Sequence, residues 1–399
     1  MRMCLYEDRG AANLAPLAVA RPAFDLFGGL GTLKDGLVRY FQPDSLGYLV
    51  RKSLAPALQR REPAVPVNDP RWLRAGPALL TNARWLPGTA PSQPLNRKPH
   101  LAMCGPEIAY AMLGADQLAG VSPSSLDDCL DDWIDLLPKV EVGGCVAKSA
   151  DDLLAHAGAR IAAEYPQSDA LHSPPPGVAL VGPSELLHLD QSAAVEPMVL
   201  LDTSRGPIVL EAGVRVRAFS RIEGPCVVGA GSDIRGVLRS RTVIGPKCRV
   251  AGPLENCILL GFADIAPGCV FSGAYLGEGV RMGPGVLCES APGGAIVIGD
   301  FARLAAGVLL DRGTNLGAFA RVQATGRIAP HSVPAFGIVS REGIEPDERV
   351  NRHIQEVADE MATLGRMLEA PELELYRELS TGGADANHRT LPLPFRRAG

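Results

Sequence analysis

A six-residue periodicity of aliphatic residues limits the possible folds of this chain more than any other feature, and it covers residues 207–334. The positions in register are Leu210, Val216, Ile222, Val228, Ile234, Leu238, Ile244 and Val250, then Val270, Leu276 and Met282, and finally Ile298, Leu304, Leu310, Leu316, Val322 and Ile328. Glycine often follows the aliphatic residue, and a small residue often lies four positions after it, as at Ser220, Cys226, Ser232, Cys248, Ala302 and Ala320. A period of six, rather than seven or two, predicts a parallel β-helix with a triangular cross-section.

Each hexapeptide of such a β-helix forms one short, flat side, and glycine or a small residue turns each corner. With about 18 residues per coil, the repeat predicts about six or seven coils within a domain at residues 205–338. Slips of the register near Gly236, at residues 253–258 and at residues 291–295 predict loops that leave the coil. Another glycine-rich β-solenoid is the alternative architecture.

The segment that follows the repeat has helical spacing. Its apolar residues are Val350, Ile354, Val357, Met361, Leu364 and Leu368. This spacing predicts a C-terminal helix at residues 346–379 that covers the exposed last coil. The tail, residues 380–399, is expected to be disordered.

The first half of the chain alternates apolar segments with helix-like ones, which predicts an α/β domain at residues 1–190. Within residues 5–33 the pattern indicates a first strand, then a loop, then a helix. Because α/β proteins bind phosphate where a strand runs into a helix N-terminus, this segment is the expected phosphate loop.

Composition excludes several classes of protein. The 44 glycines and 34 prolines are too frequent for a mainly helical bundle. A net charge of −5 without a basic block argues against a nucleic-acid partner or an anionic membrane surface. With no apolar run of membrane-spanning length and no signal-peptide pattern, a cytoplasmic location is expected. The nine cysteines contain no C-x-x-C pair, which predicts reduced, mostly buried thiols.

Several short landmarks resemble those of the GlmU-related sugar nucleotidyltransferases. Residues 13–22 are similar to an N-P-L-x-x-x-R-P stretch near the start of that family, and residues 79–87 to its strand ending in N-[GA]-R-[LW]-L-P. Residues 133–136 resemble its W-D-L junction, residues 206–229 its entry into the repeat, and residues 333–337 its exit. The resemblance implies a Rossmann-like nucleotidyltransferase domain followed by a left-handed β-helix.

The resemblance also implies a reaction and its residues. A sugar 1-phosphate would attack the α-phosphate of a nucleoside triphosphate, giving a nucleotide-sugar and pyrophosphate for cell-envelope polysaccharides. The implied residues are Arg21 and Asp8 for catalysis, Arg9, Gly10, Asn13 and Asn82 for nucleotide or phosphate binding, and Asn82 and Asp135 for Mg²⁺. Two positions depart from the family pattern: Asn13 replaces the signature arginine, and Asn82 replaces the aspartate that holds the metal.

Two other functions stay open. In the related bifunctional enzymes the β-helix transfers an acetyl group from acetyl-CoA to an amino sugar, with a histidine as general base. Here Ser272 or Gly273 falls where that histidine is expected, and His331, at the exit of the last coil, is the nearest histidine. Tyr275 and Glu278 are the candidate sugar-binding residues. The third possibility is a non-catalytic sensor or scaffold that binds nucleotide-sugars, and for all three a homotrimer is expected.

Overall fold

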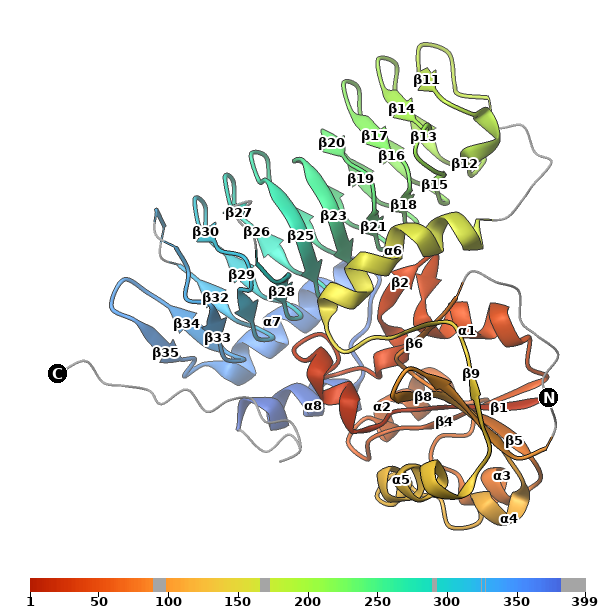
Figure 1. Cartoon of the computed structure of the whole chain (residues 1–399). Helices are drawn as coiled ribbons and strands as arrows, with labels where there is room; N and C mark the ends of the chain where they lie inside the picture. The colour runs from red at the N-terminus through yellow and green to blue at the C-terminus, as the bar shows by residue number, and fades with distance from the viewer. Residues whose placement is uncertain (89–97, 166–172, 289–292, 324, 327, 382–399) are drawn as a thin grey trace. The chain divides into compact units, whose positions relative to one another are not determined.

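The structure is a computed structural model that describes residues 1–88, 98–165, 173–288, 293–323, 325–326 and 328–381 (Figure 1). The predicted disordered tail lies outside these residues from position 382 onward. The chain divides into two compact units. Residues Met1–Asp152 and the segment from Glu369 form the first unit, and Leu153–Leu368 form the second. The predicted fold class is confirmed: an α/β domain is followed by a parallel β-helix of the left-handed hexapeptide type.

The described part of the N-terminal domain contains a six-stranded sheet with the order β4-β1-β5-β8-β7-β9. Its strands are β1 (Arg2–Tyr6), β4 (Ser45–Leu49), β5 (Ala78–Asn82), β7 (His100–Cys104), β8 (Glu107–Leu113) and β9 (Lys139–Glu141). Strands β1, β4 and β5 are parallel, whereas β8 is antiparallel to β5. The carboxyl ends of β1 and β5 therefore share one edge with the start of β8.

Short helices and two small ladders complete this domain. The helices are α1 (Leu33–Phe41), α2 (Ala55–Arg61), α3 (Pro70–Arg74), α4 (Ala115–Leu118), α5 (Leu126–Leu136) and α8 (Ala370–Ser380). The ladders pair β2 (Phe27–Gly29) with β3 (Gly31–Thr32), and β6 (Trp85–Pro87) with β10 (Gly144–Val146). Tyr6, Leu80 and Leu101 are buried with Trp133 of α5 in the core on one side of the sheet.

The α-helix expected within residues 5–33, after a strand and a loop, begins only at the end of that segment. Two 3₁₀ helices, η1 (Arg9–Leu14) and η2 (Ala23–Asp25), occupy the segment instead, and α1 begins only at Leu33. Prolines at positions 16 and 22 lack the backbone N–H that an α-helix needs there. The α1 helix is capped by Thr32, whose Oγ1 accepts a hydrogen bond from the Asp35 N–H at 3.1 Å.

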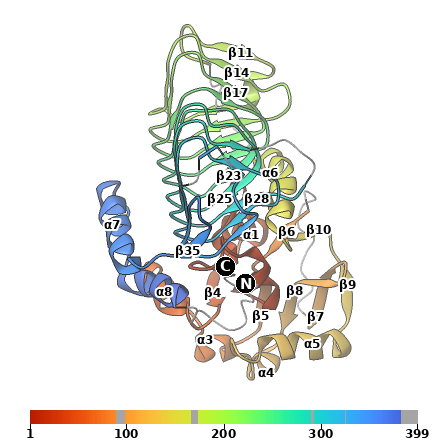
Figure 2. The same cartoon turned by 90° about the vertical axis from the view of Figure 1, so that its left-hand side faces the viewer.

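Three parallel ladders form the β-helix, and its coils stack along one axis (Figures 1 and 2). The first comprises β13 (Ala194–Val195), β16 (Arg215–Val216), β19 (Asp233–Ile234), β22 (Arg249–Val250), β24 (Asp264–Ile265), β26 (Arg281–Met282), β29 (Arg303–Leu304), β32 (Arg321–Val322) and β34 (Gly337–Val339). The second comprises β12 (Leu187–Leu189), β15 (Ile208–Leu210), β18 (Cys226–Val228), β21 (Thr242–Ile244), β23 (Leu254–Leu259), β25 (Phe271–Leu276), β28 (Ile296–Ile298), β31 (Asn315–Leu316) and β33 (Ser332–Val333). The third comprises β11 (Ala179–Val181), β14 (Leu200–Asp202), β17 (Arg221–Glu223), β20 (Val237–Leu238), β27 (Leu287–Cys288) and β30 (Leu309–Leu310). The longer strands β23 and β25 belong to both the second and the third ladder.

The β-helix is longer than its sequence repeat. Its first strand is β11, which pairs with β14, so coiling starts before residue 205, and the described residues form about nine coils rather than six or seven. The short helix η3 (Ser184–Leu186) lies between β11 and β12 and adds residues to the first coil. The six-residue spacing nevertheless continues here, because Leu189, Val195 and Leu201 pair with Leu210, Val216 and Ile222 of the next coil.

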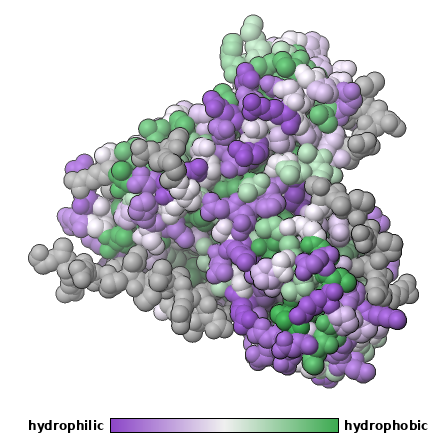
Figure 3. Space-filling view, viewed as in Figure 1, coloured by the Kyte–Doolittle hydropathy of each residue, from purple (hydrophilic) through white to green (hydrophobic). Residues whose placement is uncertain are grey.

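The stacked aliphatic residues form the predicted continuous core, with two exceptions. Leu210, Ile222 and Ile244 are at most 1% exposed, as are most positions of the register. Val270 and Ile328 instead have 42% and 54% of their surface exposed. At Val270 the neighbours Cys269 and Phe271 point inward, and in an extended strand the residue between them must then point outward. Figure 3 shows such apolar residues interspersed with polar ones on the outer surface.

The glycine that follows the aliphatic residue is required by the close approach of the next coil. At Gly317 a Cβ atom would lie 2.3 Å from the backbone nitrogen of Ala335. All nine cysteines are free thiols, and Cys226 and Cys248 are among those buried in the β-helix core. Six of the nine are buried, as predicted.

The C-terminal segment forms two helices instead of one. Helix α7 (Val350–Thr363) ends before Gly365, which has a φ of +77°, and α8 starts at Ala370. Helix α7 runs along the side of the β-helix (Figure 2), where Glu360 forms ion pairs with Arg281 and Arg303 on neighbouring coils. It therefore does not cover the last coil; there β35 (Ile344–Pro346) pairs antiparallel with β34. One further helix, α6 (Ala150–Glu164), crosses the boundary between the units.

Candidate functional site

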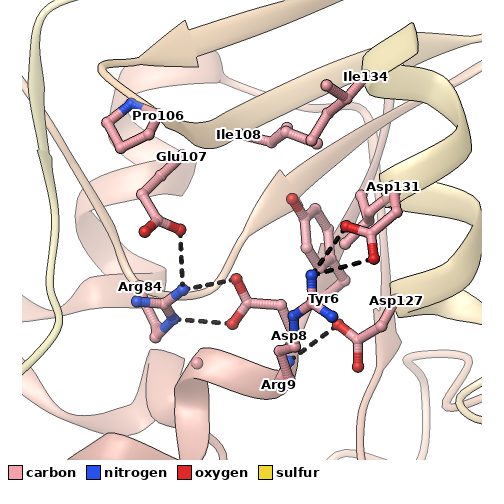
Figure 4. Close-up of a pocket in the computed structure, with 12 residues that line it drawn as sticks. Tyr6, Asp8, Arg9, Arg84, Pro106, Glu107, Ile108, Asp127, Asp131 and Ile134 are labelled. Atoms are coloured by element: carbon pink, nitrogen blue, oxygen red, sulfur yellow. Dashed lines mark hydrogen bonds and ion pairs between the residues drawn. The ribbon is translucent and has the colours of Figure 1, made fainter. Parts of the chain in front are cut away.

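A pocket of about 310 Å³ opens at the edge of the N-terminal sheet where β1 and β5 end and β8 begins (Figure 4). Ligands of open α/β sheets usually bind at the carboxyl ends of the strands. Charged side chains line this pocket: the carboxylates Asp8, Glu107, Asp127 and Asp131, and the guanidinium groups of Arg9 and Arg84. The pocket is therefore the candidate active site of the domain.

A buried ion pair between Asp8 and Arg84 forms the floor of the site. The Arg84 Nε and Nη2 atoms donate to the two Asp8 oxygens at 2.8 and 2.6 Å, and Arg84 Nη1 donates to the Ala147 carbonyl at 2.6 Å. Burial disfavours the charged guanidinium, but the hydrogen bonds to Asp8 and the negative charges of Asp8 and Glu107 together outweigh it and raise the pKa of Arg84. Arg84 thus stays charged, and its charge is already neutralised within the protein.

Gly10 and Asn82 support this ion pair. A Cβ atom on Gly10 would lie 2.3 Å from Arg84 Nη2, so the absence of a side chain leaves room for the guanidinium. The Asn82 amide donates to Asp8 Oδ2 at 2.9 Å and to the Ile108 carbonyl at 3.1 Å, and its oxygen accepts from the Arg84 N–H at 3.0 Å. Both polar atoms of Asn82 therefore have protein partners.

Arg9 connects the loop after β1 to helix α5. Its Nη2 donates to both Asp131 oxygens at 2.8 and 3.0 Å, and its backbone N–H donates to Asp127 Oδ1 at 3.0 Å. The two aspartates are four residues apart and thus share one face of α5. Burial raises the pKa of Asp127, while the Arg9 N–H acts in the opposite direction. The Arg9 side chain is 70% exposed, so a ligand can reach it.

A second ion pair, Glu7 with Arg51, holds the rest of this loop. Glu7 Oε1 accepts from the Ala23 N–H at 2.9 Å, and Arg51 donates to Glu7 at 3.1 Å. Arg51 also donates to the carbonyl oxygens of Ala18 and Arg21, at 2.6 and 3.3 Å. The backbone at Arg21 is therefore fixed by contacts behind the loop.

The structure brings together only some of the residues implied by the sequence. Asp8, Arg9 and Gly10 line the pocket, and Asn82 contacts Asp8 directly beside it. Arg21, the exposed Asn13 and the exposed Asp135 are not part of the lining of this pocket as the described residues form it.

Sequence reasoning did not identify Tyr6, Arg84, Glu107, Asp127 and Asp131, all of which line the pocket. Arg84 is the arginine of the N-[GA]-R landmark at residues 79–87, and this motif could have indicated that Arg84 is a site residue. The acidic pair on α5 could have been noticed from its four-residue spacing, but nothing in the sequence links it to the loop after β1.

The residues named for Mg²⁺ do not fit a metal site in this structure. Asn82 uses both of its polar atoms within the protein, and Asp135 is exposed and lies outside the lining of the pocket. Within the described residues, no group of three or more His, Cys, Asp or Glu side chains is arranged to hold a metal ion. A role for Mg²⁺ therefore stays a prediction from the resemblance.

Of the three candidate residues of the β-helix, two are buried and one is exposed. Tyr275 is completely buried in β25, so no ligand can reach it at the surface. Glu278 is 6% exposed and accepts from Arg366 Nε at 3.0 Å. The exposed His331 lies with its Nε2 atom 3.7 Å from Asp311.

An arginine covers the position where an acyltransferase histidine was expected. Arg312 Nη1 donates to the carbonyl oxygens of Ser272 and Gly273 at 2.8 and 3.1 Å. A Cβ atom on Gly273 would lie 1.9 Å from the same nitrogen, so a side chain there would displace the arginine. The acetyl-CoA-dependent reaction thus gains no support from this position.

One family of known proteins is similar to the N-terminal domain. Residues 3–169 match the sequence model of the family described as "Sugar nucleotidyl transferase". The match lies in the N-terminal domain, a parallel β-helix follows it in the same chain, and both agree with the resemblance seen in the sequence, which is confirmed. No curated protein matches the chain.

Among solved structures, LpxA of Bacteroides fragilis 9343, a UDP-N-acetylglucosamine acyltransferase, is 14% identical. The match covers 48% of this chain and 94% of that one, with a TM-score of 0.22. Another UDP-N-acetylglucosamine acyltransferase is 16% identical over 47% of this chain and 78% of that one, with a TM-score of 0.18.

The helices of the described residues are all too short or too polar to cross a membrane.

Proposed function

We propose that the protein transfers a nucleotidyl group from a nucleoside triphosphate to a sugar 1-phosphate, giving a nucleotide-sugar and pyrophosphate. One observation carries the proposal: the charged pocket lies at the carboxyl edge of β1 and β5, inside the segment that matches sugar nucleotidyl transferases. Supply of precursors for cell-envelope polysaccharides in the cytoplasm, by a homotrimer, is the biological role that follows from the resemblance.

Two exposed cations that line the pocket or contact its lining suit this chemistry. In the reaction, a phosphate oxygen of the sugar 1-phosphate attacks the α-phosphorus and pyrophosphate leaves, so negative charge on phosphate oxygens must be stabilised. Arg9 lines the pocket, and the Lys148 Nζ lies 3.1 Å from Glu107, which also lines it. Both side chains are more than half exposed, and a phosphate group can replace their carboxylate partners.

The test is pyrophosphate release by the purified full chain with four nucleoside triphosphates and the 1-phosphates of glucose, glucosamine and N-acetylglucosamine, with Mg²⁺ and with EDTA. Arg9→Gln should lower kcat/KM by at least about 10-fold, the effect of losing one charge-assisted hydrogen bond to a phosphate. Arg71→Gln, an exposed arginine outside the pocket, is the matched control and should leave the rate unchanged. Arg21→Ala tests the residue implied by the sequence.

A non-catalytic nucleotide-sugar-binding scaffold is the second candidate. It is favoured by the pairing of both pocket arginines with carboxylates, because a cation that is already neutralised stabilises a transition state less. Saturable binding of a nucleotide-sugar without pyrophosphate release, in a folded protein, would support this function and refute the transferase for the substrates tested.

A further inference from the structure

The sheet of the N-terminal domain has one edge that the described part of the chain leaves open. At the opposite edge, β4 is covered by the segment after α2: the Tyr48 N–H donates to the Pro66 carbonyl at 2.9 Å, and the Asn68 N–H donates to the Tyr48 carbonyl at 2.8 Å. The open edge is β9, which lies beyond β7 (Figure 2) and pairs with β7 alone among the described strands. The free backbone groups of such an edge can pair with another strand.

The backbone groups at both ends of β9 face the open edge. Strands β7 and β9 are parallel, and the Val142 N–H, just after β9, donates to the Met103 carbonyl at 2.8 Å. This register turns both backbone groups of Val140, the middle residue, towards β7. The N–H and C=O groups of Lys139 and Glu141 therefore point away from the sheet, and no described residue forms a hydrogen bond with them.

The charges of β9 are self-complementary for antiparallel pairing with a second copy. When two copies of the strand run antiparallel about a two-fold axis at Val140, Lys139 of each copy lies directly opposite Glu141 of the other. These two residues then exchange their outward-facing N–H and C=O groups across the axis. Val140, which is 44% exposed, packs against its symmetry mate.

This charge order favours a second copy over other strands. Parallel pairing of two copies in register would place like charges side by side, and a strand of a different protein would need opposite charges at the same spacing. A lysine on an edge strand ordinarily opposes pairing, but in the antiparallel arrangement the glutamate of the other copy neutralises it. Within the described residues, neither Lys139 nor Glu141 forms an ion pair, so both charges are free to do so.

We infer that β9 is an interface between two copies of this chain, in which the N-terminal sheets join into one continuous sheet across a two-fold axis at Val140. The same strand serves both copies, so the contact is closed and does not propagate. Because β9 has only three residues, the contact is smaller than a standard interface of about 1,600 Å² and the association is weak. The pairing does not depend on the proposed reaction.

Charge reversal on β9 tests the pairing in the full chain, by sedimentation velocity over a range of protein concentrations. Glu141→Lys places like charges opposite each other on both sides of the axis, so the dissociation constant of the pairing should rise at least about 5-fold. Lys139→Glu combined with Glu141→Lys recreates opposite pairs in reversed order and should restore the association. Asp132→Lys, at an exposed position of α5, makes the same change of net charge and is the matched control.

Val140→Cys tests the position of the axis. In an antiparallel pair whose residues do not bond to each other, opposing Cα atoms lie about 4.5 Å apart, within the range of about 4.4–6.8 Å in which a disulfide can form. Oxidised glutathione should therefore cross-link this variant into a dimer that dithiothreitol reverses. Asp132→Cys and the unaltered chain, whose nine native cysteines are free thiols, are the controls and should give no such dimer.

The inference is supported if Glu141→Lys weakens the association, the double variant restores it and Val140→Cys forms the cross-link. It is overturned if the mass of the unaltered chain does not rise with concentration, if Glu141→Lys associates like the unaltered chain, or if Val140→Cys forms no cross-link. Failure of the double variant to associate, with an unchanged thermal midpoint, also overturns it, because self-complementary charges would then not determine the pairing. Association that survives every substitution belongs to another surface of the chain.

Discussion

Removal of the Asp8 carboxylate should destabilise the N-terminal domain strongly. The Arg84 side chain is 3% exposed and makes two hydrogen bonds to Asp8, whose side chain is 11% exposed. Removing one partner of a buried ion pair usually costs about 3–5 kcal/mol, because the other charge is left without compensation. Glu107, 3.7 Å from Arg84, and the Ala147 carbonyl remain, so we expect Asp8→Ala to lose about 3 kcal/mol, the lower end of that range.

Tryptophan fluorescence is the appropriate assay, because the three tryptophans, Trp72, Trp85 and Trp133, all belong to the N-terminal domain. Urea titrations followed by fluorescence therefore report the unfolding of this domain, while far-UV circular dichroism also follows the β-helix. Asp135→Ala, at an exposed position, is the matched control and should change the free energy of unfolding by less than about 0.5 kcal/mol.

A double-variant cycle with Arg84→Met isolates the ion pair. If the charge left on Arg84 causes the loss, Asp8→Ala combined with Arg84→Met should be more stable than Asp8→Ala alone, despite carrying two substitutions. A loss below about 1 kcal/mol for Asp8→Ala, or losses that simply add in the double variant, would refute the reasoning.

Three further predictions concern other parts of the chain. Gly317→Ala places a methyl group against the backbone of Ala335 and should lower the stability of the β-helix by about 1–3 kcal/mol, measured by urea unfolding followed by circular dichroism. Burial disfavours the charged form of Glu62, but hydrogen bonds, led by the one from Lys34, lower its pKa. The stabilisation by charged Glu62 is therefore present above pH 4.5 and is lost as the pH falls. In a plot of the free energy of unfolding against pH, Glu62→Gln should thus show a smaller loss of stability at acid pH. Burial raises the pKa of the Cys226 thiol to about 12, so at pH 8 mass spectrometry should find it unmodified by iodoacetamide until urea unfolds the β-helix.

The β-helix could be predicted from sequence because its steric requirements repeat at every coil. Positions such as Ile222 and Gly317 meet the same neighbours one coil further along, so each must satisfy the same constraint. The prediction was wrong where insertions shift the register. Val270 keeps the six-residue spacing yet points outward. Leu189, Val195 and Leu201 also have this spacing, but the interval from Leu201 to Leu210 is longer, and the predicted repeat therefore started too late.

The candidate site was only partly predictable, because it depends on pairings between distant segments. Asp8, Arg9 and Gly10 are adjacent to a recognisable strand, which is why the sequence indicates them. Their partners Arg84 and Asp131 lie 76 and 122 residues further along. Composition and motif spacing cannot show that these cations are already neutralised, and this pairing distinguishes the pocket from a simple phosphate loop.

The reversal of chain direction at β35 affects how the β-helix can meet other β-structures. A parallel ladder ends in a row of unpaired backbone groups, which can recruit the first coil of another molecule and so start a fibre. Here β35 runs antiparallel along β34, from Ile344 to Pro346, and a proline has no N–H to offer to a following strand. The hairpin thus covers the open edge of β34, and its deletion should expose that edge to pairing with a strand of another molecule.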